Sequence, residues 1–416
     1  MEFQKIKLHR SEKNRAAVTQ ITLDDDYNVP DYRQDIVKVI KERGELRFDE
    51  VKAMEGAAWI KGSLVFKVLY RSDKQEGKIS CLRGEIPFQE RLNMDGLSEY
   101  DAVHATGDME DLTIGVINSR KLNVRAVIVL TASSEKEVDE ELTCELSDGS
   151  SYEQNIVEKE ALKLLVVRRD ICRQKSEAVL PSSKPNIREI LWQSMQLRNV
   201  ESRLVEGNIR LSGEILVSIL YNDEEEGEHL SWYETTVPLD AQAECGVMED
   251  DCIWQVQMVP LTMELEVKPD YDGEERILVM ELALDTHIRI WKEEKIRLLT
   301  DLYSLQKEVK PVFRECPLER LLVKNAAKCR MTEQMELKED KEKVLQICSC
   351  EGKVLLERQE IKTDGVLAEG TVEVNILYIT PDDHMPVGAV QEIYPFSQLV
   401  EIPEMSAQAK VELDAS

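Results

Sequence analysis

Apolar and polar residues alternate with a period of two along most of the chain, and this pattern is typical of half-buried β-strands. The clearest stretch occurs three times and runs from a glycine to a tyrosine: Gly62–Tyr70, Gly213–Tyr221 and Gly370–Tyr378. Every second residue after the glycine is apolar, whereas the fifth residue is polar in all three copies. The pattern therefore predicts three equivalent strands that each turn one face toward a hydrophobic core.

A polar turn follows each of the three tyrosines, and a second apolar run then leads to a proline: Pro87, Pro238 and Pro395. Two alternating runs joined by a polar turn predict a β-hairpin in each copy. Because proline lacks the amide hydrogen that a β-ladder requires, we expect each proline at a strand end, a bulge or a sheet edge. We also expect the three tyrosines to be buried with hydrogen-bonded hydroxyls, since a buried phenol needs a partner.

The copies are separated by domain-sized distances, so the repeating unit is a whole domain and not a short solenoid repeat. We expect an all-β protein of tandem β-sandwich-like modules, two complete (13–150 and 165–305) and one partial (318–416). Short helical connectors are expected at 157–166 and 317–328, where residues with high helix propensity gather.

The third copy stops before it reaches strands equivalent to Leu112–Leu130 and Leu261–Ile290. A module without those strands would expose apolar core and unpaired strand edges. Two explanations are open: the natural chain continues, or another chain or the preceding module covers the open face. The break falls within a module, which favours a natural chain that continues.

The chain carries a formal net charge of −28, and only 5% of its residues are aromatic. Such an acidic protein is repelled by phosphate backbones and anionic membranes, so nucleic acid is not an expected partner, whereas a protein with a basic face is. No apolar stretch is long enough to predict membrane insertion. The 9 cysteines lack CxxC spacing, which favours reduced and mostly buried thiols in an intracellular, cytoplasmic setting.

The sequence offers little that resembles a chemical site. Its 5 histidines form no metal-binding spacing, and the segment Asp270–Glu275 is better explained as a hairpin turn than as a calcium loop. The acidic runs Asp24–Asp26 and Glu224–Glu226 need no role beyond loop charge. Since no nucleophile or phosphate-binding motif is present either, we expect no enzyme activity, catalytic residue, cofactor or metal.

Cys348 and Cys350 form the one pair of side chains with potential chemistry. Residues two apart on a strand share a face, so the two thiols could bind a metal or react together. A metal would need two further ligands, and the sequence offers no such pair. Buried, inert cysteines are therefore the favoured interpretation.

The repeated Gly-to-Tyr strand and the proline after it resemble the SPOCS domain of spore coat morphogenetic proteins of the SipL and SpoVID type. The stretch Leu112–Arg125 is similar to the second half of that domain. Upstream of the first motif, Val29–Ile36 is similar to Lys184–Ile190, and we align the two. The resemblance covers two copies and one partial copy, without the C-terminal LysM domain of SipL-like proteins.

The resemblance implies a structural protein that builds or encases the spore coat from the mother-cell cytoplasm, at the forespore surface. It implies protein partners, namely the spore coat basement-layer ATPase or further copies of the same chain. In SipL-like proteins the contact with the ATPase is attributed to the LysM domain. The family supplies no catalytic residues to carry over.

A second hypothesis is an array of carbohydrate- or cell-wall-binding modules, since tandem β-sandwiches often bind glycans. Such sites use exposed aromatic platforms. The 5 tryptophans do not recur at equivalent repeat positions, which weakens this hypothesis: Trp59, Trp192, Trp232, Trp254 and Trp291. An enzyme, the third possibility, would require a polar pocket that the sequence does not reveal.

Overall fold

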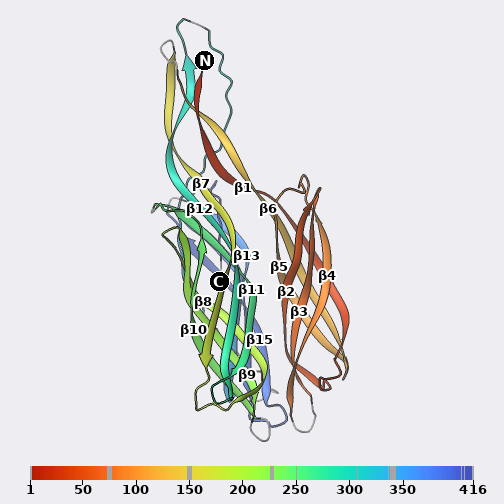
Figure 1. The fold of residues 1–416 in the computed structure, drawn as a ribbon. Coiled ribbons are helices and arrows are strands. Elements are labelled where there is room, and N and C mark those ends of the chain that lie inside the picture. Colours follow the sequence, from red (N-terminus) through yellow and green to blue (C-terminus); the bar gives the residue numbers. More distant parts are fainter. Residues whose placement is uncertain are drawn as a thin grey trace.

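The computed structural model describes residues 2–72, 77–147, 152–224, 229–249, 251–306, 308–335, 337, 343–403, 405–406 and 408–414, with the backbone alone at 12–15. Every regular element in these residues is a β-strand (Figure 1), which confirms the all-β prediction. The predicted helical connectors are wrong. Residues 157–166 lie inside a strand, where pairing with a distant strand overrides their helix propensity, and 317–328 have no regular structure.

The first module contains two antiparallel sheets of three strands. One sheet has the order β2-β3-β4 and the other β1-β6-β5. Residues from both sheets contribute to a single hydrophobic core. The strands are β1 (Phe3–Asn28), β2 (Lys38–Met54), β3 (Ala57–Arg71), β4 (Ile79–Asn93), β5 (Val103–Asn118) and β6 (Lys121–Leu146).

The second module repeats this strand order as β8-β9-β10 and β7-β12-β11, again around one core. The third module has a single sheet, β13-β14-β15, and the described residues contain no counterpart of the second sheet. The strands are β7 (Glu153–Val179), β8 (Ile187–Val205), β9 (Asn208–Asp223), β10 (Leu230–Glu244), β11 (Ile253–Pro269), β12 (Glu275–Tyr303), β13 (Gln346–Lys362), β14 (Gly365–Ile379) and β15 (Val387–Glu401).

The Gly-to-Tyr segments form the central strands β3, β9 and β14 of three equivalent sheets. Phe66 of β3 and Val217 of β9 occupy matching core positions and are at most 1% exposed, whereas Val374 of β14 is only partly buried. The difference follows from the architecture, because in the described residues a second sheet covers this face in the first two modules alone.

The tyrosine that ends each segment is almost completely buried. The Tyr70 hydroxyl donates to the Gln34 carbonyl over 3.1 Å, and the Tyr221 hydroxyl donates to the Pro185 carbonyl over 3.2 Å. Burial raises the pKa of both phenols to about 12. Tyr70 and Tyr221 therefore fasten the connection between the two sheets of the first and second modules to the central strand.

The repeated glycine stands opposite a β-bulge in the neighbouring strand. A Cβ at Gly62 would lie 2.4 Å from the carbonyl oxygen of Arg47, and a Cβ at Gly370 would lie 2.0 Å from that of Leu355. Register shifts mark the bulge on β2, β8 and β13 alike. Only glycine fits there without displacing backbone. The repeated prolines lie on β4, β10 and β15, each of which forms an edge of its sheet.

An arginine clamp holds the connection between the two sheets of both complete modules, from β1 to β2 and from β7 to β8. Arg120 donates to the carbonyls of Val29, Pro30 and Arg33, over 3.2, 2.8 and 2.6 Å. Arg276 makes the same contacts in the second module, where its partners are the carbonyls of Leu180, Pro181 and Lys184. The structure thus aligns Val29–Arg33 with Leu180–Lys184, and our alignment to Lys184–Ile190 is wrong by four residues.

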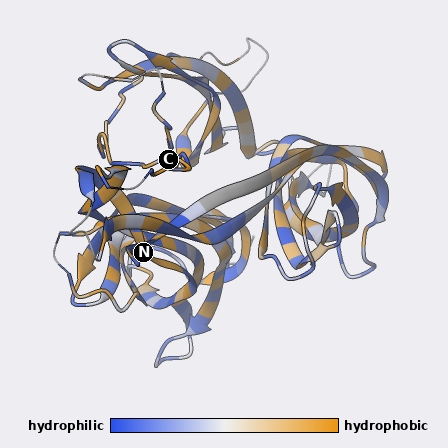
Figure 2. Cartoon of the chain, turned by 90° about the horizontal axis from the view of Figure 1, so that it is seen from above, coloured by the Kyte–Doolittle hydropathy of each residue, from blue (hydrophilic) through white to orange (hydrophobic). Residues whose placement is uncertain are grey.

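The three equivalent sheets meet at one hydrophobic junction, around which the modules are arranged (Figure 2). In each module the last strand of the sheet contacts the first strand of the next module's sheet: β4 contacts β8, β10 contacts β13, and β15 contacts β2. The ring closes with approximate threefold symmetry. The junction contains the leucine that precedes each repeated tyrosine (Leu69, Leu220 and Leu377) and a bulge residue from each first strand (Ile40, Leu191 and Cys348).

Candidate interaction surface

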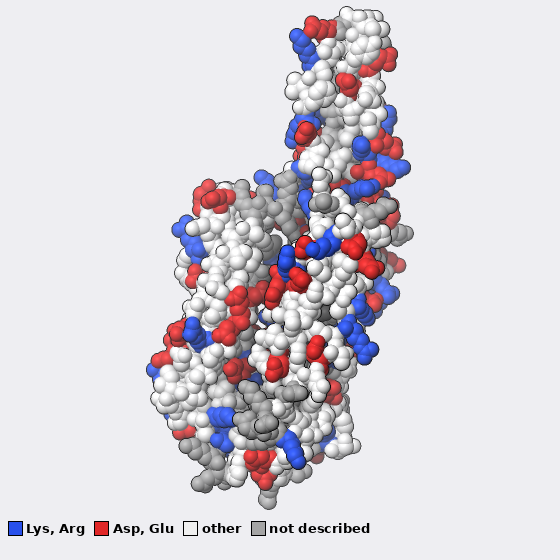
Figure 3. Space-filling view, turned by 180° about the vertical axis from the view of Figure 1, so that it is seen from behind, with Lys and Arg blue, Asp and Glu red and all other residues white. Residues whose placement is uncertain are grey.

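Two β-ribbons extend beyond the modules and pack against each other (Figure 1). Ribbon 1 pairs Phe3–Lys13 of β1 with Glu135–Leu146 of β6, past the point where β5 ends its pairing with β6 at Ser134. Ribbon 2 pairs Glu153–Lys163 of β7 with Lys292–Tyr303 of β12, past the end of β11. Together they form the narrow extension that Figure 3 shows from behind, with charges of both signs on its surface.

A small hydrophobic core holds the two ribbons together. Leu8 and Leu142 of ribbon 1 pack with Ala161 and Ile296 of ribbon 2, and all four are buried. The segment after β12 completes this core with Cys316 and Leu318. Its Glu319 carbonyl accepts a hydrogen bond from the Leu162 amide over 2.7 Å. One edge of ribbon 2 therefore already hydrogen-bonds to the segment that follows β12.

Cross-strand ion pairs cover the outer face of ribbon 1. Lys5 Nζ lies 3.1 Å from Glu141 Oε2, and Lys7 Nζ lies 4.0 Å from Asp139 Oδ2. The same Asp139 is hydrogen-bonded to His9, whose Nδ1 lies 2.5 Å from Oδ1. On the inner side, Arg10 Nη2 lies 2.8 Å from an oxygen of the buried Glu140. Basic residues of β1 thus match acidic residues of β6 at successive positions.

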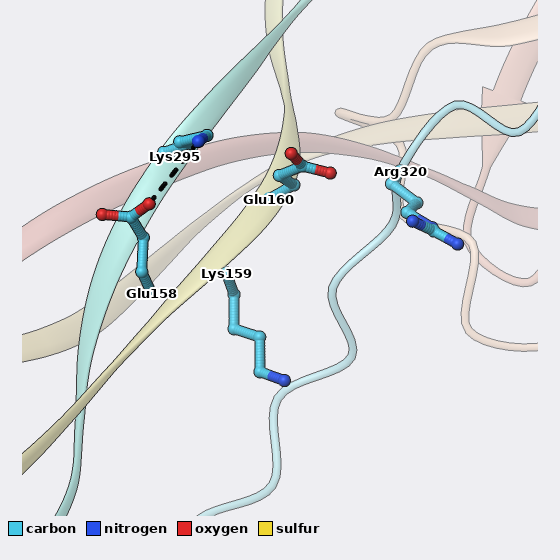
Figure 4. Close-up of a pocket in the computed structure, with 5 residues that line it drawn as sticks. All are labelled: Glu158, Lys159, Glu160, Lys295 and Arg320. Carbon is cyan, nitrogen blue, oxygen red and sulfur yellow. Dashed lines mark ion pairs between the residues drawn. The ribbon is translucent and has the colours of Figure 1, made fainter.

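Ribbon 2 carries a shallow, charged depression on its surface (Figure 4). It is lined by Glu158, Lys159 and Glu160 of β7, by Lys295 of β12, and by Arg320 of the following segment. Glu158 and Lys295 form an ion pair of 3.7 Å. Small-molecule sites are mostly apolar and bury their ligand, so this depression does not suit a substrate or cofactor.

A polar network joins the first module to the second. Arg169 of β7 donates to Asp285 of β12 through Nε, over 2.7 and 2.9 Å to the two carboxylate oxygens. Its Nη1 lies 2.6 Å from Nδ1 of His104 on β5. The guanidinium therefore connects the two modules directly.

A second histidine completes this network. The ring of His287 on β12 lies 5.8 Å from that of His104, and its Nε2 lies 3.3 Å from an oxygen of Glu135 on β6. Burial lowers the pKa of both histidines below the usual value, and the Arg169 guanidinium lowers that of His104 further. Both rings are therefore held in the neutral form at neutral pH.

The two cysteines that could act together are separated by a bulge. Cys348 is the extra residue of the β13 bulge and is buried in the three-sheet junction, where burial raises its pKa to about 12. Cys350 is exposed. The expectation of a shared face is wrong, because the bulge interrupts the alternation between them.

One cluster has the residue types of a metal site. Ligand atoms of Glu249, Asp251 and Cys252 lie within 4.8 Å of one another. Lys292 forms an ion pair with Glu249 and lies 3.5 Å from Asp251, so an ammonium group already offsets part of the negative charge. Burial also raises the pKa of Cys252, which disfavours the thiolate that a metal requires. The cluster therefore does not suggest a metal centre.

The sequence landmarks do not converge on one site. The repeated glycines, tyrosines and prolines lie in three separate sheets, which meet through other residues such as the leucine beside each tyrosine. The arginine clamp and the ribbon pair were missed. Pro30 and Pro181 occupy the same place in the two clamped segments, so a comparison of these prolines could have located the segments. No sequence pattern around Arg120 or Arg276 identifies the arginines that hold them. The run Glu224–Glu226 lies partly outside the described residues. The described part of the chain contains no helix that could span a membrane.

Two segments of the chain, residues 35–117 and 343–416, match the protein-family model described as SipL, SPOCS domain. The predicted resemblance to the SPOCS domain family is confirmed. The first SPOCS match spans β2 to β5, and the second includes β13 to β15, so both contain the equivalent three-stranded sheet. That family is a structural and interaction family, and the match suggests a sporulation-related protein. Neither a curated protein nor a solved structure matched the chain.

Proposed function

We propose that this chain is a non-catalytic structural protein of the spore coat, which acts through protein–protein contacts during coat assembly or encasement. The SPOCS match over both segments is the observation that carries this proposal. The proposed partners are the coat basement-layer ATPase and further copies of this chain, with neither nucleic acid nor membrane insertion involved. The proposed location is the mother-cell cytoplasm at the forespore surface, and the proposed modules are β-sandwich-like.

The distribution of surfaces supports a binding role. Buried side chains fill the cores and the three-sheet junction. One open depression on the ribbons is lined by charged residues, and another, between the two ribbons, is lined by charged and apolar residues. The ribbons, in contrast, present long strand edges outside the modules, which are suited to β-strand addition. With a net charge of −28, the chain attracts basic partners over long range.

The glycan-binding alternative gains no support. Trp192 is only 3% exposed and lies in the three-sheet junction, so it cannot serve as an aromatic platform.

Affinity capture from sporulating cells tests the proposal. The immobilised chain should retain coat proteins, including the basement-layer ATPase, from mother-cell extract, and retention should fall as salt rises from about 0.05 to 0.5 M because screening weakens surface electrostatics. Extract from vegetative cells is the control. Retention of peptidoglycan fragments without coat proteins would contradict the proposal.

A further inference from the structure

The β6 edge, defined as Lys136–Glu145, has a strand neighbour on one side only. These residues pair with β1, and β5 pairs with β6 only as far as Ser134. Among the described residues, no other strand hydrogen-bonds to this part of the β6 backbone. An edge with unpaired amide and carbonyl groups is a template for an additional strand.

The outward side chains of the β6 edge form an acidic row. Glu137, Asp139 and Glu141 are all exposed, and their two-residue spacing places them on one face. In the described part of the chain, no cation lies within ion-pair distance of Glu137. Two of the three carboxylates thus engage β1, and the third is available.

The strand that already binds β6 shows which sequence such an edge accepts. In β1, the basic side chains of Lys5, Lys7 and His9 alternate with the apolar side chains of Ile6 and Leu8. The basic residues face Asp139 and Glu141, and the apolar ones pack toward ribbon 2. A strand on the opposite side of β6 would meet the same acidic row and the same inner side.

A second copy of the β6 edge does not fit this edge. Edge-to-edge pairing of two copies would place the acidic rows beside each other, and like charges on neighbouring strands are destabilising. The acidic row therefore prevents self-pairing and favours a basic strand.

We propose that the β6 edge binds an extended segment of another protein in which basic and apolar residues alternate, by addition of that segment as a third strand of ribbon 1. This inference deepens the proposed function, on which it rests, by naming the surface and the chemistry of the partner segment. Backbone hydrogen bonds supply affinity, and the acidic row supplies selectivity.

A synthetic peptide with the β1 sequence Phe3–Arg10, blocked at both ends, serves as the probe. Fluorescence polarisation with the full chain should show binding that weakens several-fold between about 0.05 and 0.5 M salt. The same peptide with glutamate at each lysine and arginine should not bind. Hydrogen exchange should show new protection at 136–145 and unchanged protection at 3–10, which distinguishes strand addition from displacement of β1.

Matched charge reversals test the site. Glu137→Lys should weaken peptide binding roughly three- to tenfold, because it places a cation opposite the basic strand. Glu214→Lys makes the same charge change at an exposed position of the central strand β9 and should leave binding unchanged. Equal melting temperatures would show that both variants fold.

Two results would overturn the inference: equal affinity for the peptide in both variants, or binding without new protection at 136–145. Capture of coat proteins by the Glu137→Lys variant at the wild-type level would place the partner elsewhere and leave the proposed function intact. Peptide binding without capture of coat proteins would contradict the proposed function and leave the inference about the β6 edge intact.

Discussion

At the scale of single residues, Tyr221 combines a buried ring with one hydroxyl hydrogen bond to the Pro185 carbonyl. Tyr221→Ala should cost about 3–5 kcal/mol of unfolding free energy, as expected for loss of a large core side chain. Tyr221→Phe, which removes only the hydrogen bond, should cost about 1 kcal/mol. Urea unfolding followed by tryptophan fluorescence measures both. Tyr271→Ala at a fully exposed turn is the control, and equal stability of the two alanine variants would refute the structural role.

The arginine clamp makes a second prediction at this scale. Arg276 satisfies three backbone carbonyls in the connection between β7 and β8, and its side chain is only 12% exposed. Arg276→Ala should destabilise the protein by about 2–3 kcal/mol, because those carbonyls lose a charged donor. Arg203→Ala, which removes an exposed ion pair with Glu201, should change the melting temperature little. Equal melting temperatures for Arg276→Ala and Arg203→Ala would contradict this account.

Histidines at the module interface predict a pH dependence. Because burial lowers the pKa of His104 and His287, the unfolded chain binds protons more readily than the folded one as pH falls below about 6.5. Stability is therefore full above that pH and is lost as pH falls toward the folded pKa. The melting temperature of His104→Gln should fall less between about pH 7 and 5 than that of the wild type. His229→Gln is the control, and parallel curves for wild type and His104→Gln would exclude the interface as the cause.

At the scale of elements, the repeated glycine and the bulge opposite it depend on each other. Gly62→Ala should destabilise the first module by about 1–3 kcal/mol, since its Cβ would meet the Arg47 carbonyl at 2.4 Å. Gly115→Ala has open space and should be neutral or slightly stabilising. Differential scanning calorimetry compares the two. A Gly62→Ala variant that melts like wild type would show that the bulge adjusts at no cost.

Elements were predictable from sequence where the signal is local. The hairpins around Tyr70 and Tyr221 followed from period-two alternation and turn residues, because strand face and turn chemistry are set by neighbouring residues. The segment 157–166 was mistaken for a helix, since its glutamates, lysines and leucines favour one and its partner strand lies far along the chain. Cys348 and Cys350 were assigned to one face because a bulge leaves no reliable mark in a single sequence.

At the scale of the whole molecule, the arrangement depends on contacts that no local pattern encodes. In the sequence, nothing distinguishes the leucine before each repeated tyrosine from other strand residues. The structure nevertheless brings these leucines together at the junction that closes the ring of sheets: Leu69, Leu220 and Leu377. The packing of the two ribbons, and with it the free β6 edge, depends equally on residues far apart in sequence, such as Leu8 and Ile296. The sequence therefore predicted the modules' motifs and the family, but neither the junction nor the candidate interaction surface.

The central claim is that this protein functions by assembling with the spore coat. Fluorescence microscopy of a functional fusion during sporulation tests it most directly, with free fluorescent protein as the control. The account predicts a ring around the forespore that forms as the coat assembles and that is lost when the basement-layer ATPase is absent. A signal that stays diffuse in the mother cell throughout sporulation would contradict it.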